Sequence, residues 1–183
     1  MISNGKRFEQ NIKKSCEKQG ILFERFIDSN KFSTGGQEGI RFTPESPCDG
    51  FLYYKGNLVF VELKTATTGA ISFNQPPDVQ PKGKSNPSIK SHQVKALLKR
   101  CKYDGVSSFL LVEFSDRETK TKVIKGGCYL ICINTFYEWA VECGKKSMNV
   151  DDSNMLGCEI KTETKRVNTS YDIEDVLCRM LWI

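Results

Sequence analysis

Two apolar segments that flank a short turn and end in charged residues constrain the fold of this chain more than any other feature. Residues 51–54 and 58–63 are rich in aromatic and β-branched side chains, and Lys55-Gly56-Asn57 between them is typical of a hairpin turn. Asp49 precedes the first segment, and Glu62-Leu63-Lys64 ends the second. An antiparallel hairpin centred on this turn places Asp49 opposite a residue between 62 and 64, about 5 Å away.

The residues at the open end of this hairpin suit phosphodiester chemistry. Side-chain alternation puts Glu62 and Lys64 on one face of the strand and Leu63 on the other. Two nearby carboxylates, from Asp49 and Glu62, suit Mg²⁺, with Mn²⁺ as a substitute, and the backbone carbonyl of Leu63 is a further candidate ligand. Such a metal polarises a phosphate and acidifies bound water, while Lys64 orients that water or stabilises developing negative charge. An isolated Glu-x-Lys sequence is usually a surface ion pair, but charges that end a strongly apolar strand favour a site.

Helical and strand patterns alternate along the rest of the chain. Phe8, Ile12 and Cys16 recur at helical spacing after Ser3 or Asn4 and before Gly20, which predicts an amphipathic helix. Further strands are predicted at residues 21–27, 106–114 and 127–133, an edge strand at 159–166, and helices at 88–103, 136–143 and 173–181. Residues 29–47 are predicted to be irregular, residues 69–86 a long exposed loop, and Asp116-Arg117-Glu118 a turn. This order predicts an α/β fold with a mixed sheet and flanking helices, in a single domain over residues 1–183.

Composition excludes several classes of protein. The apolar runs are shorter than the roughly 18 residues that a membrane span requires, and the N-terminus is polar, so we expect a cytoplasmic protein, in the host cytoplasm if the source is viral. The eight cysteines are scattered without a Cys-x-x-Cys pair, and His92 is the only histidine. Reduced thiols packed as small hydrophobic side chains are therefore favoured over disulfides or a zinc site.

The positive charge lies in the N-terminal part of the chain. The net charge is +5, and residues 1–103 carry 17 basic and 9 acidic side chains, a net charge of +8. Residues 79–103 contain no acidic side chain, which predicts a surface for the DNA backbone, although a solvated helix face has a similar pattern. The residues predicted to contact DNA are Lys82, Lys84, Lys90, His92, Lys95, Lys99 and Lys102.

The spacing of the charged residues resembles a known nuclease signature. Pro47-x-Asp49, twelve intervening residues and Glu62-x-Lys64 resemble the motif of the PD-(D/E)xK nuclease superfamily. More narrowly, the chain resembles the RecU-type Holliday junction resolvases, including phage versions. The segments that carry this resemblance span residues 5–114 and are Gly5-Lys6-x-Phe8-Glu9, Asp49-Gly50, Glu62-x-Lys64-Thr65 and Ile89-x-x-His92-Gln93 before Phe109-Leu110-Leu111-Val112.

The resemblance implies a restriction-endonuclease-like fold and a homodimer that cleaves four-way DNA junctions. It implies that Asp49, Glu62 and Glu9 bind the metal, that Lys64 is the catalytic lysine and that Gln93 assists. Residues 29–47 look too short for the stalk of RecU-type proteins, residues 69–86 are longer than expected, and residues 125–183 have no clear counterpart. We therefore expect a catalytic core at residues 5–114 and a C-terminal extension at 125–183. A restriction- or repair-type endonuclease and a non-catalytic accessory protein that binds branched DNA are the alternatives.

Overall fold

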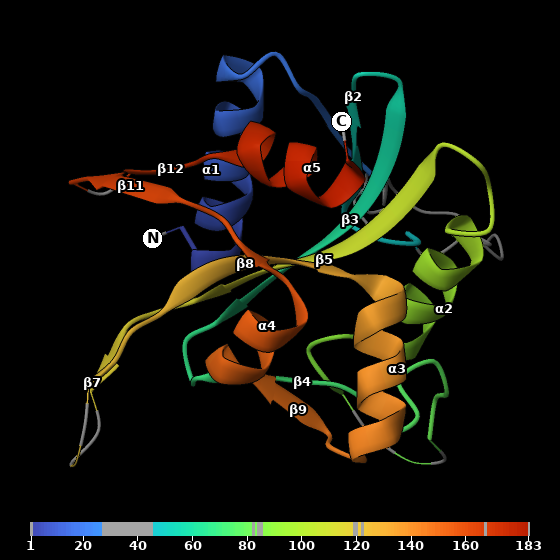
Figure 1. Ribbon diagram of the computed structural model, residues 1–183. Helices are drawn as coiled ribbons and strands as arrows, with labels where there is room; N and C mark the ends of the chain where they lie inside the picture. The colour runs from blue at the N-terminus through green and yellow to red at the C-terminus, as the bar shows by residue number, and fades with distance from the viewer. Residues whose placement is uncertain are drawn as a thin grey trace, which may run out of the picture.

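A six-stranded mixed sheet forms the centre of the molecule (Figure 1). The computed structural model describes residues 2–26, 46–81, 83, 86–118, 121, 123–166 and 168–182. In spatial order the strands are β1 (Leu22–Arg25), β2 (Gly50–Tyr54), β3 (Asn57–Ala66), β5 (Val106–Phe114), β8 (Gly127–Cys132) and β10 (Cys158–Glu159). β3 and β5 pair in parallel, and the other neighbours pair antiparallel. With helices on both faces, this sheet confirms the predicted mixed α/β fold.

Each face of the sheet packs against its own helices. On one face α1 (Asn4–Lys18) and α5 (Ile173–Leu181) pack against side chains such as Val61 and Leu111. On the other face α2 (Ser91–Arg100) and α3 (Ile133–Cys143) pack against side chains such as Leu110 and Val112. The central residues of β5, Phe109–Val112, are all apolar and buried because both faces of the strand are covered. Glu62 lies between Val61 and Leu63 in β3, so its side chain points to the α2 face and away from α1.

The first helix agrees with its sequence pattern. Ser3 caps α1 by accepting a hydrogen bond from the backbone of Lys6, and Phe8, Ile12 and Cys16 are all buried. Within the described ranges, no helix combines the length and the apolar character that a membrane crossing requires.

The predicted long loop at residues 69–86 was partly wrong. β4 (Ala70–Ser72) pairs with β9 (Ser147–Asn149), which leads into the short helix α4 (Val150–Leu156). Ile71 and Phe73 are buried, and the Phe73 ring meets Phe136 of α3 at 5.1 Å between centroids. These apolar contacts outweigh the local preference of a Gly- and Pro-rich segment for irregular structure. Residues 27–45, which include most of the predicted connection at 29–47, lie outside the described ranges.

Two hairpins project from the same side of the molecule (Figure 1). The first pairs β6 (Arg117–Glu118) with β7 (Val123–Ile124), where the sequence predicted only a turn. The second pairs β11 (Thr162–Lys165) with β12 (Asn168–Tyr171). The edge strand predicted at 159–166 is therefore two strands, since β10 pairs with β8 of the central sheet and β11 pairs with β12.

Candidate active site

The β2–β3 hairpin brings Asp49 and Glu62 together, as its spacing predicts. Lys55 and Gly56 both have positive φ angles, 46° and 81°, as the tight two-residue turn of a twisted hairpin requires. The pairing runs from Tyr54↔Asn57 to Gly50↔Val61, and the next position along sets Asp49 opposite Glu62. The backbone N–H of Asp49 donates to Glu62 Oε2 at 3.1 Å.

Further hydrogen bonds fix Asp49. Its Oδ2 accepts from the backbone N–H of Leu63 at 2.8 Å, and its carbonyl accepts from the N–H of Phe26 at 2.9 Å. The strands approach closely at the next residue, where a Cβ on Gly50 would lie 2.3 Å from the carbonyl oxygen of Glu24 in β1. Backbone contacts on both sides therefore determine the orientation of the Asp49 carboxylate.

Glu62 is fully buried and is held by two further side chains. Its Oε1 accepts from Gln93 Nε2 at 2.6 Å and lies 2.5 Å from Lys64 Nζ. Gln93 is itself fixed, because its Oε1 accepts from the backbone N–H of Lys90 at 3.0 Å at the start of α2. The first turn of α2 therefore orients the carboxylate of Glu62.

The electrostatics of the site favour a bound cation. The pKa of Glu62 is raised to about 7, chiefly because the carboxylate is buried; the Lys64 ammonium opposes this rise, and the Asp49 carboxylate adds to it. One ammonium thus compensates two neighbouring carboxylates incompletely, and an uncompensated buried charge costs several kcal/mol or more. Two carboxylates in this setting fit a hard divalent cation such as Mg²⁺, with Asp49 and Glu62 as ligands.

Glu9, the third predicted acidic ligand, lies on α1 and contacts β1. It forms an ion pair with Arg25 at 3.1 Å, and Arg25 lies opposite Gly50 in β1. No group of three or more His, Cys, Asp or Glu side chains within the described ranges is arranged to hold a metal. α1 instead approaches β3 through Gly5, where a Cβ would lie 4.0 Å from Thr65 Oγ1. The roles of Glu9 and of the Leu63 carbonyl as metal ligands stay predictions.

Arg100 is a neighbour of the site that the sequence did not single out. Its guanidinium lies 4.5 Å from the centroid of the Phe60 ring. Its charge also lowers the pKa of the Cys48 thiol, which burial, as the larger effect, raises to about 12. Because Arg100 is seven residues after Gln93 on α2, helical spacing was the signal that would have placed both on one face.

The predicted DNA-contacting residues on and beside α2 are exposed where the structure describes them. Lys82 and Lys84 lie outside the described residues, and His92 is partly exposed in the first turn of the helix. The exposed members are Lys90, Lys95, Lys99 and Lys102.

Similarity to known proteins is distant. No family model matches the chain. The chain is 26% identical over 181 residues to the SPbeta prophage-derived uncharacterized protein YotM of Bacillus subtilis (strain 168), covering 92% of this chain and 82% of that protein. A solved structure, Hjc, a Holliday junction resolvase from the archaeal hyperthermophile Archaeoglobus fulgidus, is similar with a TM-score of 0.49 and 13% identity, covering 85% of this chain and 95% of that one.

Proposed function

We propose that this chain is a metal-dependent DNA endonuclease that hydrolyses phosphodiester bonds in branched DNA, with four-way junctions as its substrate. The observation that carries the proposal is the fully buried Glu62 carboxylate, which faces Asp49 and contacts Lys64 and Gln93. A buried carboxylate beside a second carboxylate destabilises the fold, so it is not explained by a structural role alone. Carboxylates with raised pKa values in such settings concentrate at functional sites.

The chain's own residues divide the work at this site. When bound by Asp49 and Glu62, Mg²⁺ or Mn²⁺ supplies Lewis acidity toward a phosphate and lowers the pKa of a bound water. Leu63 N–H and Gln93 keep the two carboxylates in place. Lys64, now paired with Glu62, is the group that neutralises the negative charge developing on the phosphate.

The substrate proposal rests on the surface beside the site and on the sequence resemblance. The exposed lysines of α2 follow directly after Gln93 and suit contacts to phosphates, which carry no sequence information. The segments shared with RecU-type resolvases point to four-way junctions. A homodimer acting in the cytoplasm completes the proposal, because two symmetry-related sites match the two-fold symmetry of a junction.

Cleavage assays with matched variants test the proposal. Wild-type protein, Glu62→Gln and Lys64→Ala are incubated with labelled four-way junction, linear duplex and single-stranded DNA, with Mg²⁺, Mn²⁺ or EDTA. Glu142→Gln, which changes an exposed carboxylate of α3, is the control with an unaltered site. We expect symmetric junction cuts from wild type and the control only, and only with a divalent metal.

The other outcomes distinguish the alternatives. Cleavage of linear duplex in preference to junctions would support a restriction- or repair-type endonuclease. Tight junction binding without cleavage in either metal would refute the enzyme and leave an accessory DNA-binding protein. Cleavage by Glu62→Gln at the wild-type rate would show that another site is responsible.

A further inference from the structure

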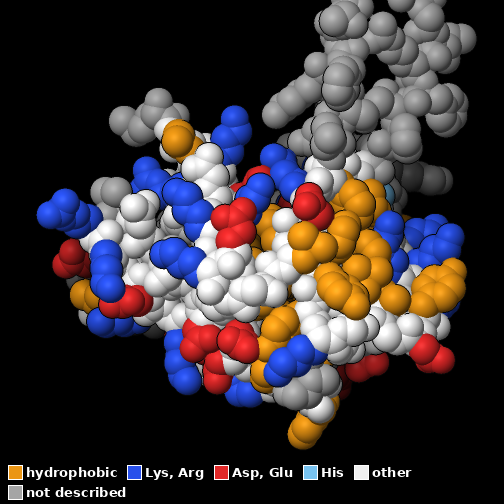
Figure 2. Space-filling view, turned by 90° about the horizontal axis from the view of Figure 1, so that it is seen from above, with side chains coloured by type: hydrophobic (Ala, Val, Ile, Leu, Met, Phe, Trp, Pro, Cys, Tyr) orange, Lys and Arg blue, Asp and Glu red, His pale blue; other side chains and the backbone are white. Residues whose placement is uncertain are grey.

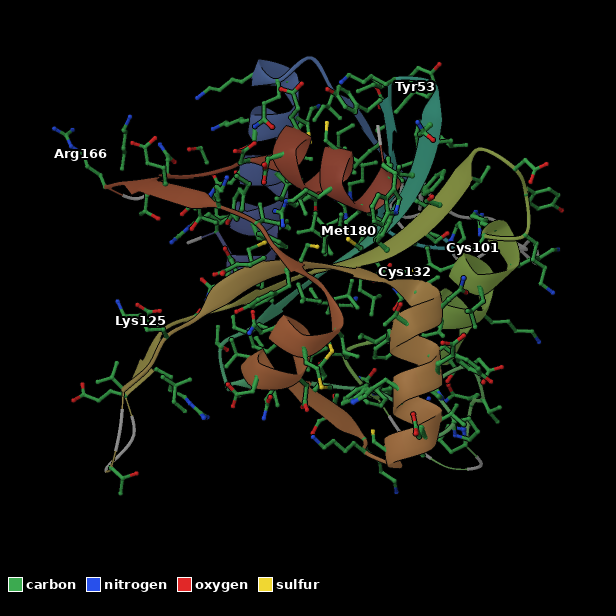
Figure 3. The ribbon with its side chains drawn as sticks, viewed as in Figure 1. Tyr53, Cys101, Lys125, Cys132, Arg166 and Met180 are labelled. Atoms are coloured by element: carbon green, nitrogen blue, oxygen red, sulfur yellow. The ribbon has the colours of Figure 1, made fainter. Side chains whose placement is uncertain are left out.

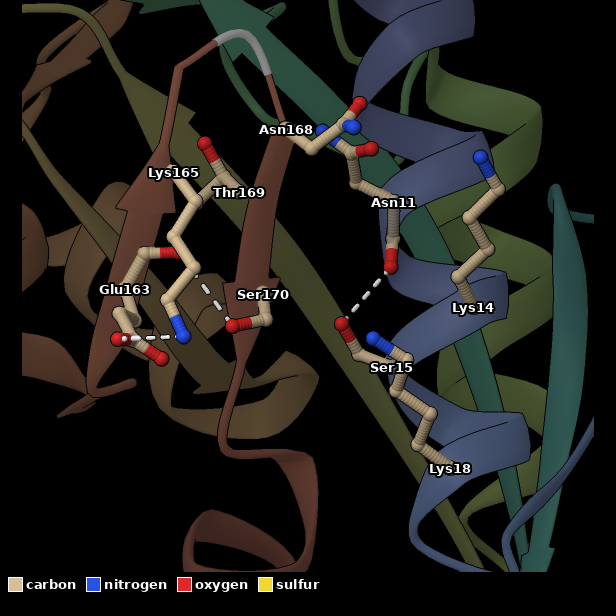
Figure 4. Close-up of a pocket in the computed structure, with 9 residues that line it drawn as sticks. All are labelled: Asn11, Lys14, Ser15, Lys18, Glu163, Lys165, Asn168, Thr169 and Ser170. Carbon is tan, nitrogen blue, oxygen red and sulfur yellow. Dashed lines mark hydrogen bonds and ion pairs between the residues drawn. The ribbon is translucent and has the colours of Figure 1, made fainter.

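A polar groove lies between α1 and the β11–β12 hairpin, apart from the carboxylates of the candidate active site. It has a volume of about 440 Å³ and lies between one side of α1 and the inner side of the hairpin (Figure 4). The residues that line it are Asn11, Lys14, Ser15, Lys18, Glu163, Lys165, Asn168, Thr169 and Ser170.

The charge of the groove is positive. Lys14 and Lys18 are exposed, lie one turn apart on α1, and form no ion pair with any described residue. The one acidic side chain of the lining, Glu163, is already paired with Lys165 at 3.1 Å. Three lysines against one glutamate leave a net charge of +2 on the lining. Figure 2 shows Lys and Arg side chains to be frequent on the side of the molecule where α1 and this hairpin lie.

A buried amide points into the groove. Asn11 is only 6% exposed, and within the described part of the chain its side-chain amide has no hydrogen-bond partner. Figure 4 shows Asn11 and Asn168 facing one another across the groove. The Asn11 amide therefore offers free donor and acceptor groups to a polar ligand in the groove.

The lining chemistry indicates the kind of ligand. Lysine ammonium groups, side-chain amides and hydroxyls are the groups that contact phosphate and sugar oxygens of nucleic acids. None of the nine lining residues is aromatic, so the groove does not offer the stacking surface that binds unpaired bases. At the tip of the hairpin, Arg166 projects away from the body of the protein and extends the basic surface (Figure 3).

The position of the groove relative to the candidate site suits a long polyanion. Gly5 of α1 lies beside Thr65, the residue after Lys64 in β3. At a rise of about 1.5 Å per residue, the backbone of Lys14 lies about 14 Å from Gly5 along α1, and that of Lys18 about 20 Å. These distances are about half of one turn of a DNA duplex, which is about 34 Å long.

We propose that this groove is a second contact surface for DNA, in which Lys14, Lys18 and Asn11 bind the phosphate backbone of a duplex arm whose scissile bond lies at Glu62. The assignment deepens the proposed nuclease function, on which it rests for the position of the scissile bond. The groove itself recognises phosphates and not bases.

Equilibrium binding in EDTA tests the groove without cleavage. Lys14→Ala/Lys18→Ala is compared with wild type and with Lys13→Ala/Lys146→Ala, a control that removes the same charge from two exposed positions outside the groove. Labelled duplex and four-way junction DNA are the probes. Lys14→Arg/Lys18→Arg keeps the charge and should bind like wild type.

The salt dependence of binding gives the expected size. Each lost phosphate contact lowers the slope of log K against log salt by about 0.9 for duplex DNA. The loss of two contacts lowers the slope by about 1.8. When the salt is raised from 50 to 200 mM, the loss of DNA affinity should therefore be about 12-fold smaller for the groove variant than for wild type. The control pair should keep the wild-type slope.

The outcomes separate this proposal from the nuclease proposal. A reduced slope for the groove variant alone supports the groove, whether or not the wild-type protein cuts DNA. Equal slopes for the groove and control variants, or no DNA binding by wild type, overturn it. Retained binding of wild type to an acidic peptide but not to DNA also overturns it, and would assign the groove to a protein partner.

Discussion

Replacing Glu62 with Gln should stabilise the metal-free protein at alkaline pH while it abolishes cleavage. Glutamine has the shape of the protonated glutamate but never ionises. In the folded protein the pKa of Glu62 is raised from its ordinary value of 4.5 to about 7. Between these two values the folded wild-type protein retains a proton that the unfolded chain releases. The wild-type stability therefore falls as the pH rises, whereas the variant lacks this loss.

The size of this effect follows from the same pKa difference. At about 1.36 kcal/mol per pKa unit, the free energy of unfolding of Glu62→Gln relative to wild type should increase by about 2.5 kcal/mol between pH 5 and pH 8. Contributions that do not depend on pH, such as an altered hydrogen bond to Gln93, cancel in this difference. Urea denaturation in EDTA at both pH values measures it. A difference that stays constant with pH, or that changes in the opposite direction, would refute the assigned burial and charge balance.

Adding metal should offset most of the stability difference between wild type and Glu62→Gln at pH 8. Mg²⁺ at 100 times its dissociation constant should stabilise wild type by about 2.7 kcal/mol and leave Glu62→Gln nearly unchanged, which the same denaturation series in Mg²⁺ measures.

Three further substitutions test other parts of the structure. Gln93→Ala removes the amide that holds Glu62, and metal affinity or cleavage rate should fall about 10- to 100-fold with little change in the melting temperature. Gly50→Ala forces a Cβ against the backbone of β1, and urea denaturation should show a loss of about 1–3 kcal/mol. Tyr171→Phe removes the hydroxyl that donates to the largely buried Glu113, a carboxyl whose pKa is raised by burial. The free energy of unfolding should fall by about 1–3 kcal/mol at neutral pH, and junction cleavage should be retained at low temperature.

The parts of the fold that local sequence determines were predictable. The β2–β3 hairpin needs only a turn that accepts positive φ angles between two apolar strands, and its register then fixes the approach of Asp49 to Glu62. α1 needs only its helical spacing and the Ser3 cap. Ile71 and Phe73 were predicted to lie in an exposed loop because their burial depends on β9 and α3, more than 60 residues away in the chain.

The candidate site was predictable in part for the same reason. Strand alternation places Glu62 and Lys64 on one face, but the α2 partner of that face depends on the parallel pairing of β3 with β5. An auxiliary role for Gln93 was suggested by resemblance and not by any local pattern, and its contact with Glu62 was not predicted. Helical spacing identifies the buried side of α1, but it does not reveal that α1 covers the face opposite Glu62 or that Glu9 pairs with Arg25.

Under the proposed function, the hydrogen bond from Gln93 to Glu62 makes α2 part of both the DNA-binding surface and the metal site. The exposed lysines of this helix face the solvent from the same rigid element whose first turn holds the buried carboxylate. A polyanion that changes the position or mobility of α2 alters how firmly Gln93 holds the Glu62 carboxylate, and therefore its affinity for a cation. A cation bound at Glu62 in turn alters the position that α2 prefers. Because such coupling is reciprocal, DNA and metal should change each other's affinity by the same factor.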